Sequence, residues 1–400
     1  MRRALTILSI LIVLGGAGAA AYFYYFGSTA GVEVAAPTDT SLPSAGNAEV
    51  PVPGSETTAP TTPVSAPTTV SARLVQISKG PVVPGVVVMN KTATASSSAE
   101  TEVRYIERQS GNVYSYSTKS GSITRISNRT VPGIQSALWL PDGSTAFIRY
   151  LSGADFSTVN SYALPSNGTG GFFLAQDLSD LAVSSAGILS LSSGVNGSIA
   201  SLSRADGTRV TQLFTTPLSQ MRVSFAGPGK YLAYTSPSAA LPGAAYLVDG
   251  TGTFSRAAGP LFGLVAKASP AGKWVLASFT FEGSLRMMLV NAATGEKINL
   301  PVATIADKCV WTADETAVYC GVPVDPSSGA RYPDDWYQGA VPFSDRIWKI
   351  QVDGRYAQFV LDFGKENGSS VDVLSPAIDP AGTTLVFINK NDGALWIYSL

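Results

Sequence analysis

Few side chains in this chain are able to carry catalytic chemistry, because its 400 residues include no histidine. Ser-His-Asp and Cys-His triads, histidine-ligated metals and histidine acid–base catalysis are therefore excluded. Two cysteines are too few for an all-thiolate zinc site or an iron–sulfur cluster. Lysine plus arginine (27) nearly balance aspartate plus glutamate (28), so no positive excess exists to hold nucleic acid. We expect no metal, no cofactor and no nucleic-acid partner.

The remaining candidates for chemistry are carboxylates in one aromatic-rich segment. Asp334 and Asp335 are adjacent, and Asp345 follows them. A pair of carboxylates about 5–10 Å apart is able to hydrolyse a glycosidic bond. The chain shows no sialidase-type aspartate box, however, and aspartates in turns more often accept hydrogen bonds from local backbone N–H groups. A glycan hydrolase of the cell envelope is therefore the alternative to a non-catalytic function.

The same segment, residues 324–345, has the composition of a binding loop. Its aromatic anchors and their acidic neighbours are Tyr332, Asp334, Asp335, Trp336 and Tyr337. Aromatic anchors within a polar surround are typical of sites that bind a protein or a glycan. The alternative is a rigid loop whose rings pack onto the structure beneath. The sequence leaves these two interpretations open.

The two cysteines are placed for a disulfide across a hairpin. Cys309 and Cys320 lie at equal distances from a turn centred on Asp314-Glu315, so they should face each other on two antiparallel strands. Directly opposed residues approach to about 4.5 Å between Cα atoms, within reach of a disulfide. Two buried free thiols are the alternative. Neither a Cys-x-x-Cys spacing nor a basic cluster indicates redox activity.

These residues must be positioned by a repeated element that begins near residue 73. A strand, a small-residue turn and a second strand recur, with equivalent turn positions at Gly143, Gly187, Gly229, Gly272, Glu315 and Gly382. The spacings of 44, 42, 43, 43 and 67 residues indicate a period of about 43 with one insertion of about 24 residues. The four-stranded blades of a β-propeller have this period.

We therefore predict an all-β fold in which residues 73–400 form a seven-bladed β-propeller. The chain stops at the third strand of its last blade, and Leu74–Ser78 resembles the missing fourth strand. We expect this N-terminal strand to complete the last blade and close the ring. The insertion would then project from the face opposite to the one at which the N-terminal tether enters.

The repeats resemble those of TolB-like and WD-type β-propellers. Their motif, an apolar strand followed by Ser-Pro-Asp-Gly-Lys and a second strand, is nearly intact at Ala268-Ser-Pro-Ala-Gly-Lys-Trp-Val-Leu276 and at Leu140-Pro-Asp-Gly-Ser144. The resemblance covers nearly all of residues 73–400 and implies an extracytoplasmic scaffold that binds other proteins. This chain departs from TolB-like proteins in its predicted anchor and in lacking an obvious separate partner domain, so no particular partner is implied.

The N-terminal segments predict export and membrane attachment. Arg2 and Arg3 precede an uncharged run from Ala4 to Phe26 that is long enough to cross a bilayer, and no further basic residue occurs before Arg73. The positive-inside rule leaves this N-terminus in the cytoplasm and the rest outside. A signal peptide cleaved near Ala17-Gly18-Ala19 is the alternative.

The sequence divides into three predicted segments. Residues 1–26 are the predicted single-pass transmembrane anchor, residues 27–72 a flexible linker rich in Pro, Ser and Thr, and residues 73–400 the propeller. The predicted location is the cell membrane, with the propeller outside the cytoplasm. The predicted function is non-catalytic binding or scaffolding, with a protein or a glycan as the partner at the outward face.

Overall fold

The structure is a computed structural model that describes residues 66–91, 100–353 and 356–400. The predicted transmembrane segment and most of the predicted linker lie outside the described residues. No helix among the residues described is long and apolar enough to span a membrane. The chain divides into two units, Met1–Thr40 and Ser41–Leu400, and every described residue belongs to the second.

The described residues form antiparallel sheets. One sheet contains β3 (Val87–Lys91), β4 (Glu100–Ile106), β5 (Val113–Ser117) and β6 (Ile123–Arg125). The next contains β7 (Ile134–Trp139), β8 (Thr145–Ser152), β9 (Thr158–Pro165) and β10 (Phe172–Phe173). It is followed by β11 (Leu178–Ser184), β12 (Gly187–Gly194), β13 (Gly197–Ser203) and β14 (Thr211–Thr216). Each of these sheets keeps its strands in chain order, as hairpin-linked repeats require.

The following sheet has seven strands because one long strand belongs to two repeats. Its strands are β15 (Met221–Phe225), β16 (Lys230–Thr235), β17 (Pro242–Asp249), β18 (Phe254–Ala268), β19 (Trp274–Phe281), β20 (Ser284–Asn291) and β21 (Lys297–Asn299). The first part of β18 pairs with β17, and the last part pairs with β19. β18 therefore serves as the outer strand of one unit and the inner strand of the next.

Two further sheets complete the described residues. One contains β22 (Cys309–Trp311), β23 (Ala317–Pro323), β24 (Asp345–Gln351) and β25 (Tyr356–Asp362). The other has the order β1 (Thr68–Thr69), β2 (Leu74–Ser78), β28 (Leu395–Ser399), β27 (Thr384–Asn389) and β26 (Val373–Ile378). In this last sheet β2 runs antiparallel to β28, with Leu74 opposite Tyr398. The short strand β1, which the sequence did not predict, pairs with the free edge of β2.

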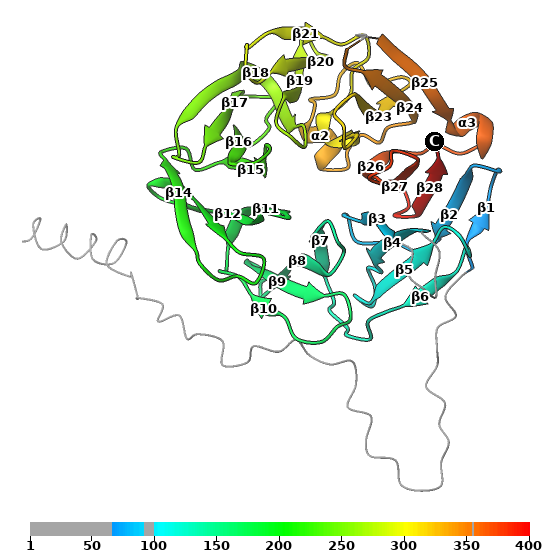
Figure 1. The fold of residues 1–400 in the computed structure, drawn as a ribbon. Coiled ribbons are helices and arrows are strands. Elements are labelled where there is room, and N and C mark those ends of the chain that lie inside the picture. Colours follow the sequence, from blue (N-terminus) through cyan, green and yellow to red (C-terminus); the bar gives the residue numbers. More distant parts are fainter. Residues whose placement is uncertain (1–65, 92–99, 354–355) are drawn as a thin grey trace, which may run out of the picture. The chain divides into compact units, whose positions relative to one another are not determined.

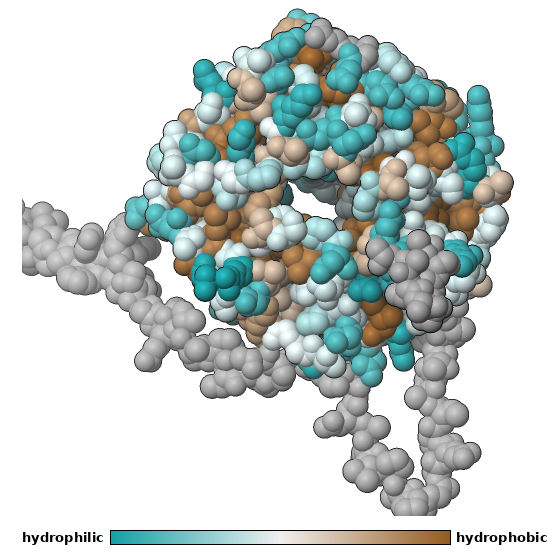
Figure 2. All heavy atoms as spheres, viewed as in Figure 1, coloured by the Kyte–Doolittle hydropathy of each residue, from teal (hydrophilic) through white to brown (hydrophobic). Residues whose placement is uncertain are grey.

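Figure 1 shows these sheets side by side around a ring, with β3, β7, β11, β15 and β26 toward its centre and β1 at its periphery. Figure 2 shows an opening at the centre of the ring. Antiparallel sheets arranged radially in this way form a β-propeller. The prediction of an all-β propeller fold is confirmed.

The predicted turn positions share one backbone conformation. All six have a positive φ, from 59° at Glu315 to 131° at Gly187. Glycine adopts this conformation without steric cost, which explains its recurrence at five of the six turns. Glu315 replaces it in the remaining turn, where its carboxylate accepts a hydrogen bond from the backbone N–H of Ala271 in the neighbouring unit.

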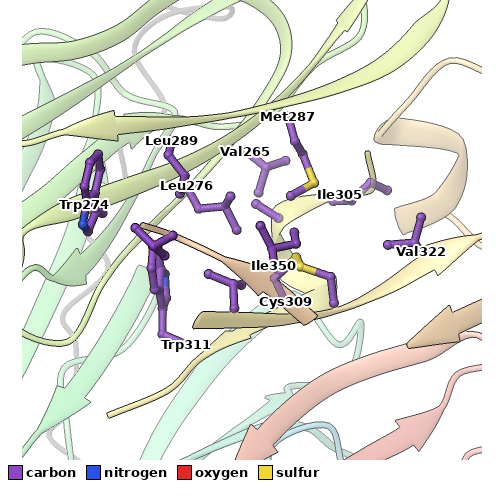
Figure 3. Close-up of a cluster of buried hydrophobic side chains, with 14 of the residues drawn as sticks. Val265, Trp274, Leu276, Met287, Leu289, Ile305, Cys309, Trp311, Val322 and Ile350 are labelled. Atoms are coloured by element: carbon purple, nitrogen blue, oxygen red, sulfur yellow. A yellow bond between two sulfur atoms is a disulfide. The ribbon is translucent and has the colours of Figure 1, made fainter. Parts of the chain in front are cut away.

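The hydrophobic core lies between neighbouring sheets. Figure 3 shows Leu276 and Leu289 from one sheet facing Cys309 and Ile350 from the next. Cys309 lies directly opposite Cys320, with 4.1 Å between their Cα atoms, and the two form a disulfide. The predicted disulfide is therefore confirmed, and it is part of this core.

The loops of the ring fall on two faces because successive strands run in opposite directions. Connections between the second and third strands of each unit lie on one face, together with the links from one unit to the next. We call this the insertion face, because residues 324–344, between β23 and β24, belong to it. Turns between first and second strands, and between third and fourth strands, lie on the opposite face.

Candidate functional site: the insertion between β23 and β24

The insertion is a structured segment that contains the one-turn helix α2 (Asp334–Tyr337). Figure 1 shows α2 beside β23 near the inner side of the ring. Tyr332 and Trp336 are each only 1% exposed, and with the buried Phe343 they belong to the core between the sheets. The rings of Trp336 and Phe343 stack with their centroids 6.2 Å apart. Tyr332 and Trp336 therefore pack into the molecule, which agrees with the second of the two interpretations of this loop.

A buried ionic cluster lies beneath α2. Lys308, at the end of the short 3-10 helix η1 (Ala306–Lys308), is 0% exposed and forms ion pairs with Asp345 and Asp372. Its Nζ is 2.7 Å from Asp345 Oδ2 and donates to the carbonyl of Val373 at 2.9 Å. The backbone N–H of Val373 donates in turn to Asp345. The cluster thus joins η1, β24 and the start of β26.

The insertion is fastened to this cluster through Asp372. The indole N–H of Trp336 donates to both carboxylate oxygens of Asp372, at 3.1 and 3.0 Å, and the backbone N–H of Phe343 donates at 3.1 Å. Lys390 lies over the ring of Trp336, with its Nζ 4.3 Å from the ring centroid. A cation held against an indole stabilises its position. These contacts hold α2 rigidly on the ring.

Lys308 forms ion pairs with both carboxylates of the cluster, and Lys390 also interacts electrostatically with Asp372. Asp345 Oδ1 is buried without a hydrogen-bond partner. Burial raises the pKa of Asp345 to about 6, although the Lys308 charge acts in the opposite direction. Because Asp345 is sealed beneath the insertion, it is placed to hold structure and not to reach a substrate.

The other two candidate carboxylates are also engaged locally. Asp334 Oδ2 accepts from the backbone N–H of Ala239 at 3.0 Å, which ties α2 to the loop between β16 and β17. Asp335 Oδ2 accepts from the backbone N–H of Arg331 at 2.8 Å, and its Oδ1 lies 3.5 Å from the Arg331 guanidinium. The structure therefore gives each predicted carboxylate a contact that fixes the insertion.

Tyr337 is the predicted aromatic residue that reaches the surface. It is 38% exposed, and its hydroxyl donates to Asp307 Oδ2 at 2.7 Å. Burial of the hydroxyl end, together with the Asp307 carboxylate, raises the pKa of Tyr337 well above its usual range. The same two causes raise the pKa of the buried Tyr234. Both phenols therefore stay neutral and keep their O–H donors at physiological pH.

Charged side chains of both signs surround Asp307 on the inner strands. Arg222 on β15 interacts electrostatically with Asp180 on β11 and with Asp307. Asp180 Oδ2 accepts from the backbone N–H of Val223 at 2.8 Å, and Lys267 on β18 donates to the carbonyl of Cys309 at 2.5 Å. The result is a polar cluster of mixed charge beside α2, in which Arg222 is exposed, Asp307 and Lys267 are half-buried and Asp180 is buried.

Exposed apolar side chains are concentrated on the insertion face. Those in its loops or at the adjoining strand ends are Leu151, Phe156, Val195, Leu218, Leu241, Phe262, Phe281, Val324 and Tyr337. Within the described residues, Val210 and Tyr356 lie at the opposite face, and Ile199 and Phe359 lie within β13 and β25 and belong to neither set of loops. Single exposed apolar side chains are normal on a protein surface, but such a bias towards one face is typical of an interaction surface.

Sequence reasoning missed Lys308, Asp372, Lys390 and Asp307. Asp307 and Lys308 are neighbours in η1, whereas Asp372 and Lys390 flank strands of the last sheet, and only the folded ring brings the two pairs beneath and beside α2. The available signal was Lys308 itself, a basic residue in the stretch Val302–Val310 that is otherwise mostly apolar. A lysine in such a stretch must find a buried anionic partner.

The fold and the insertion together define a β-propeller with one structured loop on its insertion face. No family model matches the chain, and no curated protein matches it. It is similar to solved structures at low identity. An oligogalacturonate lyase in complex with manganese is 9% identical (80% of this chain, 98% of that chain, TM-score 0.49). The β-propeller domain of the trilobed protease from Pyrococcus furiosus is 8% identical, over 84% of this chain and 92% of that chain, with a TM-score of 0.47. TolB from Acinetobacter baumannii is 12% identical, over 79% of this chain and 79% of that chain, with a TM-score of 0.43.

Proposed function

We propose that this chain is a non-catalytic binding module that recognises a protein partner with its insertion face. The observation that carries the proposal is the concentration of exposed apolar side chains on that face. A protein partner would remove such side chains from water, which is the main favourable contribution to most protein association. The charges of Asp307 and Arg222 would orient the partner and exclude others.

In this proposal the predicted loop residues have two roles. Tyr337 contacts the partner, because its ring is partly exposed beside Asp307. Tyr332, Trp336, Asp334 and Asp335 hold α2 in place through their packing and hydrogen bonds. A loop that is already rigid loses little conformational entropy on binding.

We also propose that the ring has seven blades and is closed by β2. The pairing of β2 with β28 supports closure. Division of the seven-stranded sheet within β18 supports seven units of four strands. Pairing of strands from both ends of the propeller would hold the ring shut.

The anchor and the location belong to the same proposal. Residues 1–26 would cross the membrane, residues 27–72 would act as a linker whose end is held on the ring by β1, and the propeller would lie outside the cytoplasm. The disulfide between Cys309 and Cys320 supports this location, because such bonds persist in oxidising compartments.

The non-catalytic role is favoured over glycan hydrolysis by the contacts of the candidate acids. Asp345 is buried in an ion pair, whereas Asp334 and Asp335 accept backbone hydrogen bonds that fix the insertion. Glycosidases need two carboxyl groups that are free to act on one bond. Release of sugar from cell-envelope glycans by the purified chain would overturn this part of the proposal.

Partner capture from cells tests the proposed surface. The full chain would be crosslinked in the membrane that carries it, and captured proteins would be measured by quantitative mass spectrometry. We expect Leu241→Asp and Phe156→Asp, both on the insertion face, to reduce the captured partner at least tenfold. Val210→Asp, on the opposite face, is the matched control and should capture as much as the wild type. Equal capture by all variants would rule out the insertion face.

A further inference from the structure

One strand of the ring has an edge that its own outer strand does not cover. β20 pairs with β19 along its whole length, from Ser284 to Asn291. On its other side, β21 pairs only with Met288, Leu289 and Val290. Beyond β21, the backbone N–H of Leu300 donates to the carbonyl of Met287 at 2.9 Å. In the strand pairing of the described residues, the segment Ser284–Arg286 has no partner on this side.

The alternation of the ladder points the backbone of Leu285 to this open edge. Phe281 and Ser284 close a hairpin with a two-residue turn, so they form a hydrogen-bonded pair. The next pair, Thr280 with Leu285, is then non-hydrogen-bonded, and Leu285 directs its N–H and C=O away from β19. Met287 has the same orientation two residues on, and its carbonyl does accept from Leu300.

A cavity of about 400 Å³ lies beside this segment. It is lined on the β19–β20 side by Phe279, Phe281, Arg286 and Met287, and on the other side by residues 299–303. Phe281 is 55% exposed. Arg286 is exposed as well, and no carboxylate in the described part of the chain lies within ion-pair distance of it. The groove thus combines an unpaired backbone edge, an aromatic wall and a free cation.

We propose that this edge binds an extended peptide segment of another protein, which adds to β20 as an antiparallel strand. The segment would pair with the outward N–H and C=O of Leu285, place an apolar side chain against Phe281, and direct a carboxylate to Arg286. Strand addition supplies main-chain hydrogen bonds, and pockets for side chains supply specificity. We call this site the β20 edge.

The molecule itself contains an example of a short strand added to a sheet edge. β1, only two residues long, adds to the outer edge of β2, with Thr68 opposite Gln76. The choice of an acidic peptide follows from Arg286, whose charge would repel a basic one. Phe281 is shared with the insertion face, so the inference rests on the proposed function and adds to it a second contact, which uses neither α2 nor Leu241.

Selection of peptides on the full chain, held in detergent, tests this inference. Random twelve-residue peptides would be selected on the wild-type protein, and the affinity of the selected peptides would be measured by fluorescence anisotropy. We expect alternating apolar residues with at least one Asp or Glu. Leu285→Pro should weaken binding at least tenfold, because it removes the outward N–H and leaves the bonds to β19 in place. Arg286→Glu should weaken it equally.

The controls separate this site from the part of the insertion face around Leu241 and from misfolding. Arg256→Glu, an exposed arginine on β18, and Leu241→Asp should both leave the peptide affinity unchanged. If Leu285→Pro does not fold, hydrogen exchange on the wild type gives the same information: the peptide should slow exchange of the Leu285 amide at least tenfold.

Several results would overturn the inference. No selected peptide, peptides that bind Arg286→Glu as tightly as wild type, or unchanged exchange at Leu285 would each do so. Concentration-dependent dimerisation of the wild type that Arg286→Glu abolishes, measured by sedimentation, would identify a second copy as the occupant and would also overturn it.

Discussion

At the scale of single residues, the structure depends on a lysine that no solvent reaches. Lys308 is held between Asp345 and Asp372, and Asp372 in turn receives the indole N–H of Trp336. Removing a charge from water costs several kcal/mol, and only close partners offset this cost. The cluster therefore stabilises the insertion only while all three groups are present.

Loss of the lysine should destabilise the protein strongly. Lys308→Met removes the cation that forms ion pairs with both buried carboxylates, and we expect the free energy of unfolding to fall by about 3–5 kcal/mol. Urea denaturation followed by fluorescence measures this change. Lys230→Met, at an exposed position on β16, is the matched control and should change stability by less than about 0.5 kcal/mol. Similar stability of the two variants would show that the cluster contributes nothing.

The raised pKa of Asp345 predicts a particular pH dependence. Its pKa is about 6 in the folded protein, against an ordinary value of 3.8, so the folded state holds the proton more tightly. The resulting stabilisation is fully present below about pH 3.8 and is lost as the pH rises to about 6. A rise of about two pKa units corresponds to at most about 3 kcal/mol.

Asp345→Asn isolates this effect. The variant lacks the titrating group, so its stability relative to wild type should improve by up to about 3 kcal/mol between pH 4 and pH 7. Paired urea denaturation at both pH values gives the difference. A wild-type-to-variant difference that stays constant across this range would contradict the assigned pKa shift.

At the scale of elements, the insertion is a structured segment whose buried side chains are mainly aromatic. Trp336 is buried in the core, whereas its neighbour Tyr337 is partly exposed. We expect Trp336→Ala to reduce the free energy of unfolding by about 3–5 kcal/mol, as large-to-small changes of buried aromatic residues do. Tyr337→Ala should cost much less stability and instead weaken partner capture. Thermal unfolding and capture are measured on both variants, and the reverse assignment of effects would contradict the packing described here.

Some of these elements and contacts could be predicted from the sequence, and others could not. Turn glycines such as Gly143 and Gly272 mark positive-φ positions, and the symmetric placement of Cys309 and Cys320 about one turn predicted their pairing. The burial of Trp336 was not predictable, because local composition suits an exposed anchor and a packed wedge equally. Lys308, Asp345 and Asp372 are far apart in sequence, and their meeting depends on how neighbouring sheets pack.

At the scale of the whole molecule, the two faces of the ring differ in chemistry. The insertion face carries most of the exposed apolar side chains and the charges around Asp307, whereas the opposite face presents mainly the tight turns of the repeat. A rigid ring with one such face suits display on a membrane tether. The concentration of exposed apolar side chains is the reason for placing the proposed partner on the insertion face.

The proposed location makes a prediction at this scale. Val210→Cys introduces a thiol at an exposed position on the opposite face. A membrane-impermeant maleimide should label it on intact cells, with a cytoplasmic protein as the lysis control. Labelling only after permeabilisation would place the propeller in the cytoplasm and contradict the proposed orientation.

The most direct measurement of the central claim is site-specific photocrosslinking in cells. A photoreactive phenylalanine analogue would replace Leu241 on the insertion face or Val210 on the opposite face of the full chain. The proposed function predicts a discrete protein adduct after irradiation at Leu241 and none at Val210. An adduct only at Val210, equal adducts at both positions, or none at either would contradict the claim that the insertion face binds a protein partner.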